Sequence, residues 1–535
     1  MRNLLFLAFC IMAGSAFANG LQFLRRPEPA QLHPTGLRVS WSTNMPAAAV
    51  VFYGATPDPQ LSVALETAAQ TQTVELISLQ PGTIYWVRVG AISGSDTLFS
   101  ETLPLATQSL STGQIKVFFN HPIDMAAANG WQPDGDSFQE VLAETIARIN
   151  SAQKTIDVAI YNNNRSDITA ALTQAHQRGV RVRYIAALAT DNSALSPAPP
   201  FPVLYGNEDA LMHNKFMSID ADLDQQAWVM SGSLNWTTSN MVNDFNNTLF
   251  IQDQSLARAY QLEFEEMWGS TGAAFNQANS RFGADKTDNT PHQFIIGGIP
   301  VEAWFSPSDQ PTQHIVDAIH STHVRASFAI FSFTKNEIGN AFIDQHEAGA
   351  EVRGMMENIN DPGAELDWLL KNGVSIAPHP GNYLLHHKYV VVDAGTSSDP
   401  LVLTGSHNWT NAAENSNDEN TLVLHDERLA YLYQAEFEQR WSETTTATQE
   451  PNPLGAVLFP NPTAEGAITL RLKDAEIGAG VVRIWDLWGH LLTTEQVSGA
   501  SSIRIPVSQW PTGTYWLTLT TDRGSAAFSF QTISP

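Results

Sequence analysis

The sequence carries the same short motif twice, and this repetition constrains the fold more than any other feature. The motif reads H-x-K-x4-D, and the serine of a G-S-x-N segment follows twenty positions after its histidine. The second copy repeats the first at one constant offset, which is the separation of His213 and His386 and holds at every motif position. The motif positions are His213, Lys215, Asp220, Ser233 and Asn235, then His386, Lys388, Asp393, Ser406 and Asn408. A single H-x-K is common in strands, but two such constellations at one offset indicate a duplicated domain.

The spacing within each motif points to phosphodiester chemistry. Side chains two apart in a strand lie on one face, so each histidine and its lysine share one volume. Two copies brought together supply two imidazoles, two ammonium groups, and hydroxyl and amide donors. One imidazole can attack phosphorus and the other can protonate the leaving oxygen. The side chains expected to hold the phosphate oxygens are Ser233, Asn235, Ser406 and Asn408.

The paired motifs resemble those of the phospholipase D superfamily. The resemblance implies two α/β halves with one active site at their interface, and a covalent phosphohistidine intermediate. It makes His213 the nucleophile and His386 the acid that protonates the leaving alcohol and then activates water. Lys215 and Lys388 would hold the phosphoryl oxygens. The sequence leaves open which histidine attacks.

The two motif aspartates, Asp220 and Asp393, are grouped with the catalytic residues because they complete the motif. Relatives use this aspartate mainly for structure. His387, next to His386, does not have the H-x-K spacing and is interpreted as incidental.

The two copies differ eleven positions after each motif asparagine, where one has Glu419 and the other Asn246. In relatives this position orients a catalytic histidine. A carboxylate raises the basicity of its histidine and fixes its tautomer, whereas an amide only orients the ring. The difference can therefore separate the two catalytic roles. The alternative is that Glu419 is a solvated loop acid.

The repeat extends well beyond the motifs. In the first half, periodicity predicts a helix, a strand, a helix and a strand at 138–149, 155–161, 166–177 and 180–185. The second half repeats this order, with 327–331 matching 157–161, and its loops before the second motif are slightly longer. Alternating strands and helices predict an α/β fold, a duplicated core of two α/β sandwich halves around a pseudo-two-fold axis. The halves are placed at 109–270 and 296–442.

The N-terminus reads as a secretory signal peptide covering 1–18, with a basic start, an apolar run and Ala16-Phe17-Ala18 as the cleavage site. A membrane anchor is the alternative, but the apolar run is short for a span. The one cysteine, Cys10, lies here, so the mature chain would have no disulfide and no thiolate metal site.

Residues 20–108 are predicted to form a β-sandwich. The segment 79–89, Leu-Gln-Pro-Gly-Thr-Ile-Tyr-Trp-Val-Arg-Val, resembles the corner motif of fibronectin type III domains, and Trp41 would be the core tryptophan. The sequence shows no chemistry in this region.

A linker at 443–455 leads to a second β-sandwich at 456–535. Its Asn461-Pro462-Thr463, Asp486-Leu487-Trp488-Gly489 and Gly513-Thr514-Tyr515-Trp516-Leu517 segments resemble the C-terminal sorting domain of type IX secretion cargo. The resemblance implies contact with the type IX machinery and a secreted or cell-surface protein. A carbohydrate- or surface-binding β-domain is the alternative.

Composition narrows the choice of substrate without deciding it. The chain of 535 residues has a net charge of −26, which argues against a broad nucleic-acid groove.

The two lysines supply the positive charge that a divalent ion would bring, so neither a metal nor a cofactor is expected. The Asn- and Asp-rich stretch 358–361 is interpreted as a solvated loop rather than a calcium site. No segment after the N-terminus is apolar enough for a transmembrane helix.

Three functions remain open. The first is a secreted phospholipase D that cleaves the head group from a phosphatidylcholine-type lipid to give phosphatidate. The second is a secreted endonuclease of the same superfamily, and the third is a non-catalytic surface-binding protein. Acidity favours lipid over nucleic acid, and so does an apolar, proline-rich segment at 195–204 that can line an entrance. The head group and the oligomeric state stay open.

Overall fold

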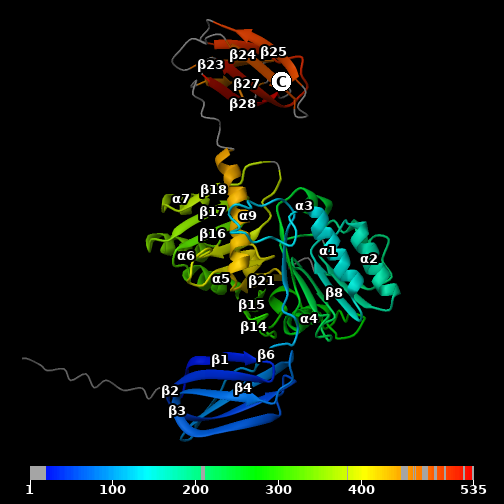
Figure 1. Cartoon of the computed structure of the whole chain (residues 1–535), viewed down its shortest axis with the longest axis vertical. Coiled ribbons are helices and arrows are strands. Elements are labelled where there is room, and N and C mark those ends of the chain that lie inside the picture. The colour runs from blue at the N-terminus through cyan, green and yellow to red at the C-terminus, as the bar shows by residue number, and fades with distance from the viewer. Residues whose placement is uncertain are drawn as a thin grey trace, which may run out of the picture. The chain divides into compact units, whose positions relative to one another are not determined.

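The computed structural model describes residues 20–446, except 189, 207–210 and 382, and much of 456–532. In that last range it describes 456–461, 463, 466–472, 480–486, 491–498, 502–521 and 524–532. The predicted signal peptide and most of the predicted linker lie outside the described residues, as do Pro462 and 487–489 of the tail motifs. The chain divides into two compact units, Met1–Gln439 and Arg440–Pro535 (Figure 1).

The N-terminal part of the first unit is all β. Its strands are β1 (Phe23–His33), β2 (Gly36–Gly54), β3 (Leu61–Ile77), β4 (Ile84–Ser93), β5 (Asp96–Phe99) and β6 (Leu103–Ala106). They are linked in one antiparallel network in which β2 and β4 are central. Trp41 is buried in the core, as expected. The Tyr85 hydroxyl accepts the Gln80 backbone N–H at 2.9 Å, the type of corner that its motif predicts.

The first half of the duplicated core is a seven-stranded sheet in the order β10-β9-β8-β11-β12-β13-β7. The strands are β7 (Ile115–Phe119), β8 (Thr155–Ile160), β9 (Arg181–Ala186), β10 (Val203–Tyr205), β11 (Lys215–Ile219), β12 (Trp228–Gly232) and β13 (Asn247–Ile251). The helices are α1 (Phe138–Ser151), α2 (Ser166–Gln177), η1 (Ser193–Leu195), α3 (Thr238–Val242) and α4 (Gln254–Trp268).

The second half repeats the first with one added edge strand, in the order β14-β15-β21-β20-β19-β16-β17-β18. The strands are β14 (Gln293–Ile296), β15 (Ile299–Ser306), β16 (Arg325–Ile330), β17 (Glu351–Met356), β18 (Ser375–Pro378), β19 (Lys388–Val392), β20 (Leu401–Gly405) and β21 (Glu419–Leu424). The helices are α5 (Pro311–His320), α6 (Asn336–Glu347), α7 (Leu366–Lys371), α8 (Asn411–Asn415) and α9 (Glu427–Thr446), and η2 (Gly283–Asp285) lies between the halves.

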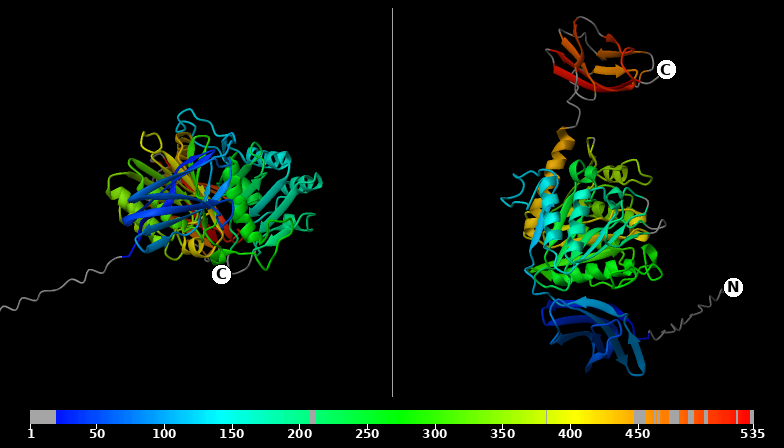
Figure 2. Two further views of the ribbon diagram at one scale, coloured as in Figure 1. Left: turned by 90° about the horizontal axis from the view of Figure 1, so that it is seen from below. Right: turned by 90° about the vertical axis from the view of Figure 1, so that its right-hand side faces the viewer.

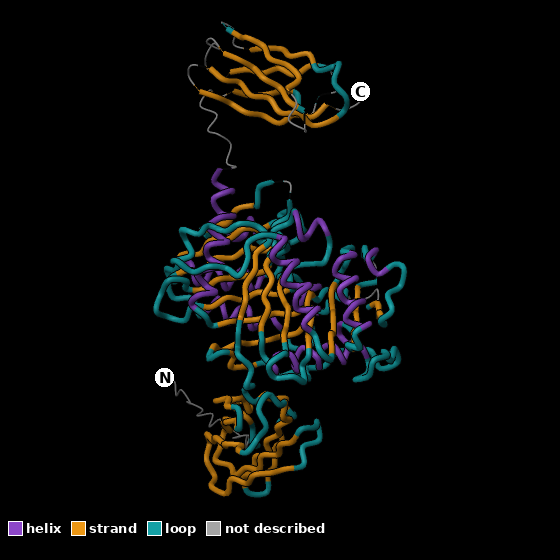
Figure 3. The backbone as a smooth tube through the Cα atoms, turned by 45° about the vertical axis from the view of Figure 1, so that its right-hand side comes forward, coloured by secondary structure: helices purple, strands orange, loops and turns teal. Residues whose placement is uncertain are grey.

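Both sheets are mixed, and their central strands are buried on both faces. Strands β8, β9 and β10 run parallel, whereas β11 runs antiparallel to β8. Burial on both faces explains why β11 and β19 read as nearly continuous apolar runs rather than alternating ones. Helices α1 and α2 pack together beside the first sheet, and α4 packs against β8, β11 and β12 (Figures 1 and 3).

Residues at matching positions connect the two halves, as a pseudo-two-fold axis requires. Tyr260 of α4 packs edge-on against Phe305 of the second half, with ring centroids 5.0 Å apart. Tyr433, its counterpart in the repeat, packs in the same way against Phe119 of the first half at 5.2 Å. Figure 2 shows the two halves from two further directions. The fold is therefore the duplicated α/β core that the repeat predicts.

The C-terminal unit is a β-sandwich within the described residues. One sheet has the order β22-β23-β26 and the other β25-β24-β27-β28. The strands are β22 (Ala456–Phe459), β23 (Ala467–Leu472), β24 (Gly480–Trp485), β25 (Leu491–Val497), β26 (Ser502–Pro506), β27 (Gly513–Thr521) and β28 (Gly524–Thr532). Tyr515 of the third tail motif is buried in its core.

Among the described residues, no helix is both long enough and apolar enough to cross a membrane.

Candidate active site

The two motif histidines lie just before β11 and β19, and each is fixed to the other half of the core. The His213 backbone N–H donates to the Asp418 carbonyl at 3.0 Å, and the His386 N–H donates to the Phe245 carbonyl at 3.0 Å. Asp418 and Phe245 themselves occupy equivalent positions of the repeat. The backbone therefore brings the starts of both motifs to the interface between the halves.

The groups that orient the two imidazoles are exchanged between the halves. Glu419 of the second half holds His213 of the first, with Oε2 2.6 Å from Nδ1. Asn246 of the first half holds His386 of the second, with Oδ1 2.9 Å from Nδ1. Asn246 Nδ2 donates to the Asn240 carbonyl at 2.8 Å, which leaves Oδ1 as the acceptor for the ring. In both histidines Nδ1 is occupied, so Nε2 is the nitrogen available for chemistry.

The two lysines are buried and are held identically. Lys215 Nζ donates to the His213 carbonyl and Lys388 Nζ to the His386 carbonyl, each at 2.7 Å. Lys215 Nζ also lies 5.2 Å from the centre of the Tyr161 ring, and Lys388 Nζ lies 4.8 Å from that of Phe331. These contacts hold both ammonium groups beside the histidines.

Sequence reasoning did not place Tyr161 and Phe331 in the site. Their rings also lie against the histidines, at 4.8 Å from His213 and 5.0 Å from His386. Each is the last residue of a predicted strand, at equivalent places in the repeat, and directly follows the observed strand β8 or β16. That shared position was the available signal, but only the pairing of β8 with β11 and of β16 with β19 shows that the rings face the motifs.

Burial and mutual repulsion lower the pKa values of the motif histidines and of Lys215. Burial, assisted by Lys215 and Lys388, lowers the pKa of His213 to about 4 although Glu419 opposes the shift. Burial and the two lysines also lower the pKa of His386 well below its usual value. Burial lowers the pKa of Lys215 to about 7, again against Glu419. His213 is therefore neutral at pH 7, with a free lone pair on Nε2.

Glu419 is ionised beside this neutral ring. Its burial alone would raise the pKa of the carboxyl, but His213 and Lys215 outweigh burial and lower it. The carboxylate thus accepts the Nδ1 proton of His213 and stabilises any positive charge that develops on the ring.

The predicted phosphate-binding residues fall into two groups. The Ser233 hydroxyl donates to Asn246 Oδ1 at 2.9 Å, and the Ser406 hydroxyl accepts the Asn420 N–H at 3.0 Å. These serines are fully buried and hold the site together. Asn235 and Asn408 have buried Oδ1 atoms that bond to none of the described groups.

The structure places Asp220 and Asp393 away from the histidines, at the far ends of β11 and β19. Asp220 accepts the backbone N–H groups of residues 153–155 at 2.7–2.8 Å. Asp393 accepts those of residues 323–325 at 2.8–2.9 Å. Each carboxylate thus satisfies the backbone of the turn that begins β8 or β16, which is the structural use that the resemblance implies for this aspartate.

His387, which the sequence marks as incidental, is fully buried behind the site. Its Nδ1 accepts from Asn247 Nδ2 at 3.2 Å, and its Nε2 lies 3.0 Å from Glu436. The equivalent residue in the first half is Asn214, whose Oδ1 accepts from Asn420 at 3.0 Å. His387 therefore belongs to a second pair of contacts between the halves and packs the interface.

A buried ion cluster that sequence reasoning missed supports the His213 side. Lys286, in the segment between the halves, contacts Glu263 of α4 and lies 3.4 Å from Asp418. All three are buried, and the two carboxylates raise the pKa of Lys286 against the effect of burial. Asp418 precedes Glu419 and binds the His213 backbone, so this cluster fixes both partners of the 2.6 Å contact.

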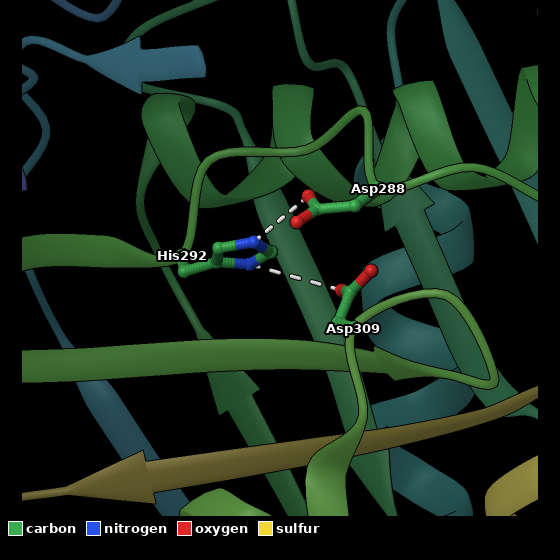
Figure 4. Close-up of side chains that lie close together, drawn as sticks. All are labelled: Asp288, His292 and Asp309. Carbon is green, nitrogen blue, oxygen red and sulfur yellow. Dashed lines mark hydrogen bonds and ion pairs between the residues drawn. The ribbon is translucent and has the colours of Figure 1, made fainter. Parts of the chain in front are cut away.

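A separate group of possible metal ligands lies in and after the segment between the halves (Figure 4). Asp288, His292 and Asp309 offer ligand atoms within 4.8 Å of one another. His292 Nε2 lies 3.0 Å from Asp288, and its Nδ1 donates to the Ala303 carbonyl at 3.1 Å. Burial disfavours its charged form, but Asp288 and Asp309 outweigh burial and raise its pKa. Both ring nitrogens of His292 thus have partners among the described residues.

Family models match both halves of the core and the C-terminal unit. Residues 145–268 and 315–441 each match a family model described as "Cardiolipin synthase, PLD-like domain". Residues 457–530 match a model described as "Secretion system C-terminal sorting domain".

Similar proteins include mitochondrial cardiolipin hydrolases. That of Xenopus laevis is 36% identical over 121 residues, which cover 22% of this chain and 55% of the relative. That of Homo sapiens is 26% identical over 192 residues, covering 35% and 66%. The chain thus spans between half and two thirds of the length of these relatives. Nuc from Salmonella typhimurium, a solved phospholipase D family member, is 25% identical, covers 27% of this chain and 94% of its own, and has a TM-score of 0.24.

The fold and the site define a duplicated α/β core in which two H-x-K motifs share one centre. The core consists of two phospholipase D-like repeats, and the chain ends in a type IX secretion sorting domain.

Proposed function

We propose that this protein is a secreted phosphodiesterase that removes the head group from phosphatidylcholine-type phospholipids and leaves phosphatidate. The observation that carries the proposal is the exchanged pair of contacts, Glu419 to His213 and Asn246 to His386. These contacts occupy Nδ1 of both rings at the interface between the halves, which leaves both Nε2 atoms for chemistry, and they give the two rings different partners. Two buried lysines and two asparagines beside them provide charge and donors for a phosphodiester.

The different partners favour His213 as the nucleophile. When Nε2 of His213 bonds to phosphorus, the ring becomes cationic, and the Glu419 carboxylate stabilises that charge. The head-group oxygen leaves as its bond to phosphorus breaks, and Nε2–H of His386 protonates it. The acid, His386, must release its Nε2 proton readily. A neutral amide partner such as Asn246 stabilises the protonated ring less than a carboxylate would, so it favours that release.

The second step reverses these roles. His386, now neutral, takes a proton from water as the water oxygen attacks phosphorus. The bond between phosphorus and His213 Nε2 breaks, phosphatidate leaves, and His213 regains its lone pair. Lys215 and Lys388 neutralise the non-bridging oxygens in both steps, and we assign to Asn235 and Asn408 the donation of their amide N–H groups to the same oxygens. The phosphodiester's own negative charge raises the pKa values of both lysines and of His386 on binding.

Export of the chain is part of the proposal. The match of 457–530 to a secretion sorting domain supports delivery to the cell surface or the medium by a type IX system. The signal peptide predicted at 1–18 would take the chain across the inner membrane first.

One paired assay tests the substrate. The mature protein in EDTA is given phosphatidylcholine vesicles, and single- and double-stranded DNA, beside a His213→Ala variant and an exposed-histidine control, His320→Ala. Choline release that the His213 variant loses and the His320 variant keeps is the expected result. DNA cleavage alone, lost in the same variant, would contradict the lipid substrate but keep the site. Activity that survives His213→Ala would refute the catalytic assignment.

The pH dependence of kcat/KM follows from the lowered pKa values of the free enzyme. As pH rises, His386 loses its proton below pH 7 and Lys215 loses its proton near pH 7, so kcat/KM should fall through neutral pH and continue to fall above it. Below about pH 4 His213 becomes protonated and can no longer attack, so the rate should fall there too. Initial rates on a monomeric phosphodiester, with thermal melts at each pH, measure this profile. A constant kcat/KM from pH 7 to pH 9 would contradict it.

A further inference from the structure

Two exposed leucines lie at equivalent positions beside the two motif histidines, and we name the surface that they flank the mouth of the site. Leu211 and Leu384 each lie two residues before a catalytic histidine, and each side chain is 39% exposed. The Leu211 carbonyl accepts the Asp418 N–H at 2.9 Å, and the Leu384 carbonyl accepts the Phe245 N–H at 2.8 Å. The same backbone contacts that fix the histidines therefore present one leucine on each side of the centre.

Other large apolar side chains lie at the same edge of the sheets. Strands β9 and β10 run parallel to β8, so their ends lie at the edge where β8 leads to Tyr161. Leu188 follows β9 and is 47% exposed, and Tyr205 ends β10 and is 41% exposed. In the second half Tyr383, beside Leu384, is 52% exposed. We name Leu211, Tyr383 and Leu384, with Leu188 and Tyr205, the apolar rim.

The segments that bear this rim contain no lysine and no arginine. This holds for residues 187–212 and 372–385, and the whole chain has a net charge of −26. A rim that received nucleic acid would need lysine and arginine to replace the counterions of the phosphates. An apolar rim without them instead matches a surface that is apolar just below neutral head groups.

We propose that the apolar rim enters the surface of a zwitterionic phospholipid bilayer and thereby places a lipid phosphodiester at the buried histidines. This inference rests on the proposed function and specifies how its substrate is reached. His213 and His386 are buried, so a phosphate in a flat bilayer reaches them only where the mouth of the site meets the membrane. Leucine and tyrosine on both sides of that mouth supply the apolar contact.

A double variant, Leu211→Ser with Leu384→Ser, separates docking from chemistry. Choline release is measured from long-chain phosphatidylcholine vesicles and from dibutyryl phosphatidylcholine kept monomeric. Interfacial binding scales with the apolar area inserted, so vesicle turnover should fall about tenfold or more while monomer turnover stays within about twofold. Leu370→Ser is the matched control, because Leu370 is 49% exposed on α7, before β18 and therefore away from the edge that bears the site.

The possible outcomes separate a failure of the docking inference from a failure of the proposed function. Equal losses of turnover on both substrates would show that the leucines serve the active site itself. Unchanged turnover on both substrates would show that the rim does not contact lipid. Either result overturns the inference. Wild-type protein inactive on both substrates would refute the proposed function instead. Flotation of His213→Ala protein with phosphatidylcholine vesicles then still tests docking: the rim is supported if the two serines abolish flotation, and is overturned if they do not.

Discussion

Replacement of His386 by asparagine is expected to stop the reaction halfway and to leave the phosphatidyl group on His213. His386 is needed twice, first to protonate the leaving alcohol and then to activate water. General acid–base catalysis contributes about 10²- to 10⁴-fold, so steady-state turnover should fall by about that factor. A substrate with a good leaving group, such as a nitrophenyl ester of phosphatidate, needs no acid in the first step. With it, the variant should show a burst of one nitrophenol per active site.

The burst is matched with direct detection of the adduct. Acid-labile label from a radioactive phosphatidyl group should remain on the variant protein after denaturation, and peptide mapping should place it on the segment that contains His213. Thermal melting of the variant against wild type excludes unfolding as the cause. Label on the peptide that contains residue 386 in a reciprocal His213→Asn variant, and none in the His386 variant, would show that the two roles are reversed.

Replacement of Lys286 by methionine is expected to damage both stability and catalysis, although Lys286 touches no substrate. The change leaves the buried carboxylates of Glu263 and Asp418 facing each other without their cation. Removal of one partner from a buried ion pair costs about 3–5 kcal/mol of folding free energy. Because Asp418 holds the His213 backbone and precedes Glu419, the loss should also lower kcat.

A rescue variant makes the Lys286 prediction specific. Lys286→Met combined with Glu263→Met removes the unpaired carboxylate nearest to the lysine, and an apolar pair of similar volume is about neutral for stability. Denaturant unfolding should therefore show the double variant to be more stable than the single one. Activity below the melting temperature is measured on a monomeric phosphodiester. A single variant as stable and as active as wild type would refute the assigned role of the cluster.

Local spacing in the sequence was sufficient for the duplicated core and for much of the site. H-x-K on a strand depends only on a period of two, and one constant offset pairs each motif position with its counterpart without any structure. The same register singled out Glu419 and Asn246. The fibronectin type III-like identity of residues 20–108 remains a prediction, supported by the buried Trp41 and the Tyr85 corner.

The parts that the sequence could not provide depend on contacts between distant segments. Spacing shows that Glu419 and Asn246 differ, but only the interface shows that each holds the histidine of the opposite half. The role of Lys286 depends on a linker residue meeting α4 and the residue before β21. Asp220 seemed to belong with its motif, yet the whole of strand β11 separates it from His213 and places it at a turn.

The exchange of orienting groups explains why two copies in one chain can do what two separate copies cannot. A symmetric pair of first halves would put an Asn246 amide against both histidines, and a pair of second halves would put a Glu419 carboxylate against both. Either pair would have two equivalent rings and no preference for which one attacks. Covalent fusion removes that symmetry, because a residue in one half can then mutate while the equivalent residue in the other half stays unchanged. The linked chain can thus divide nucleophile and acid between two rings that began as identical.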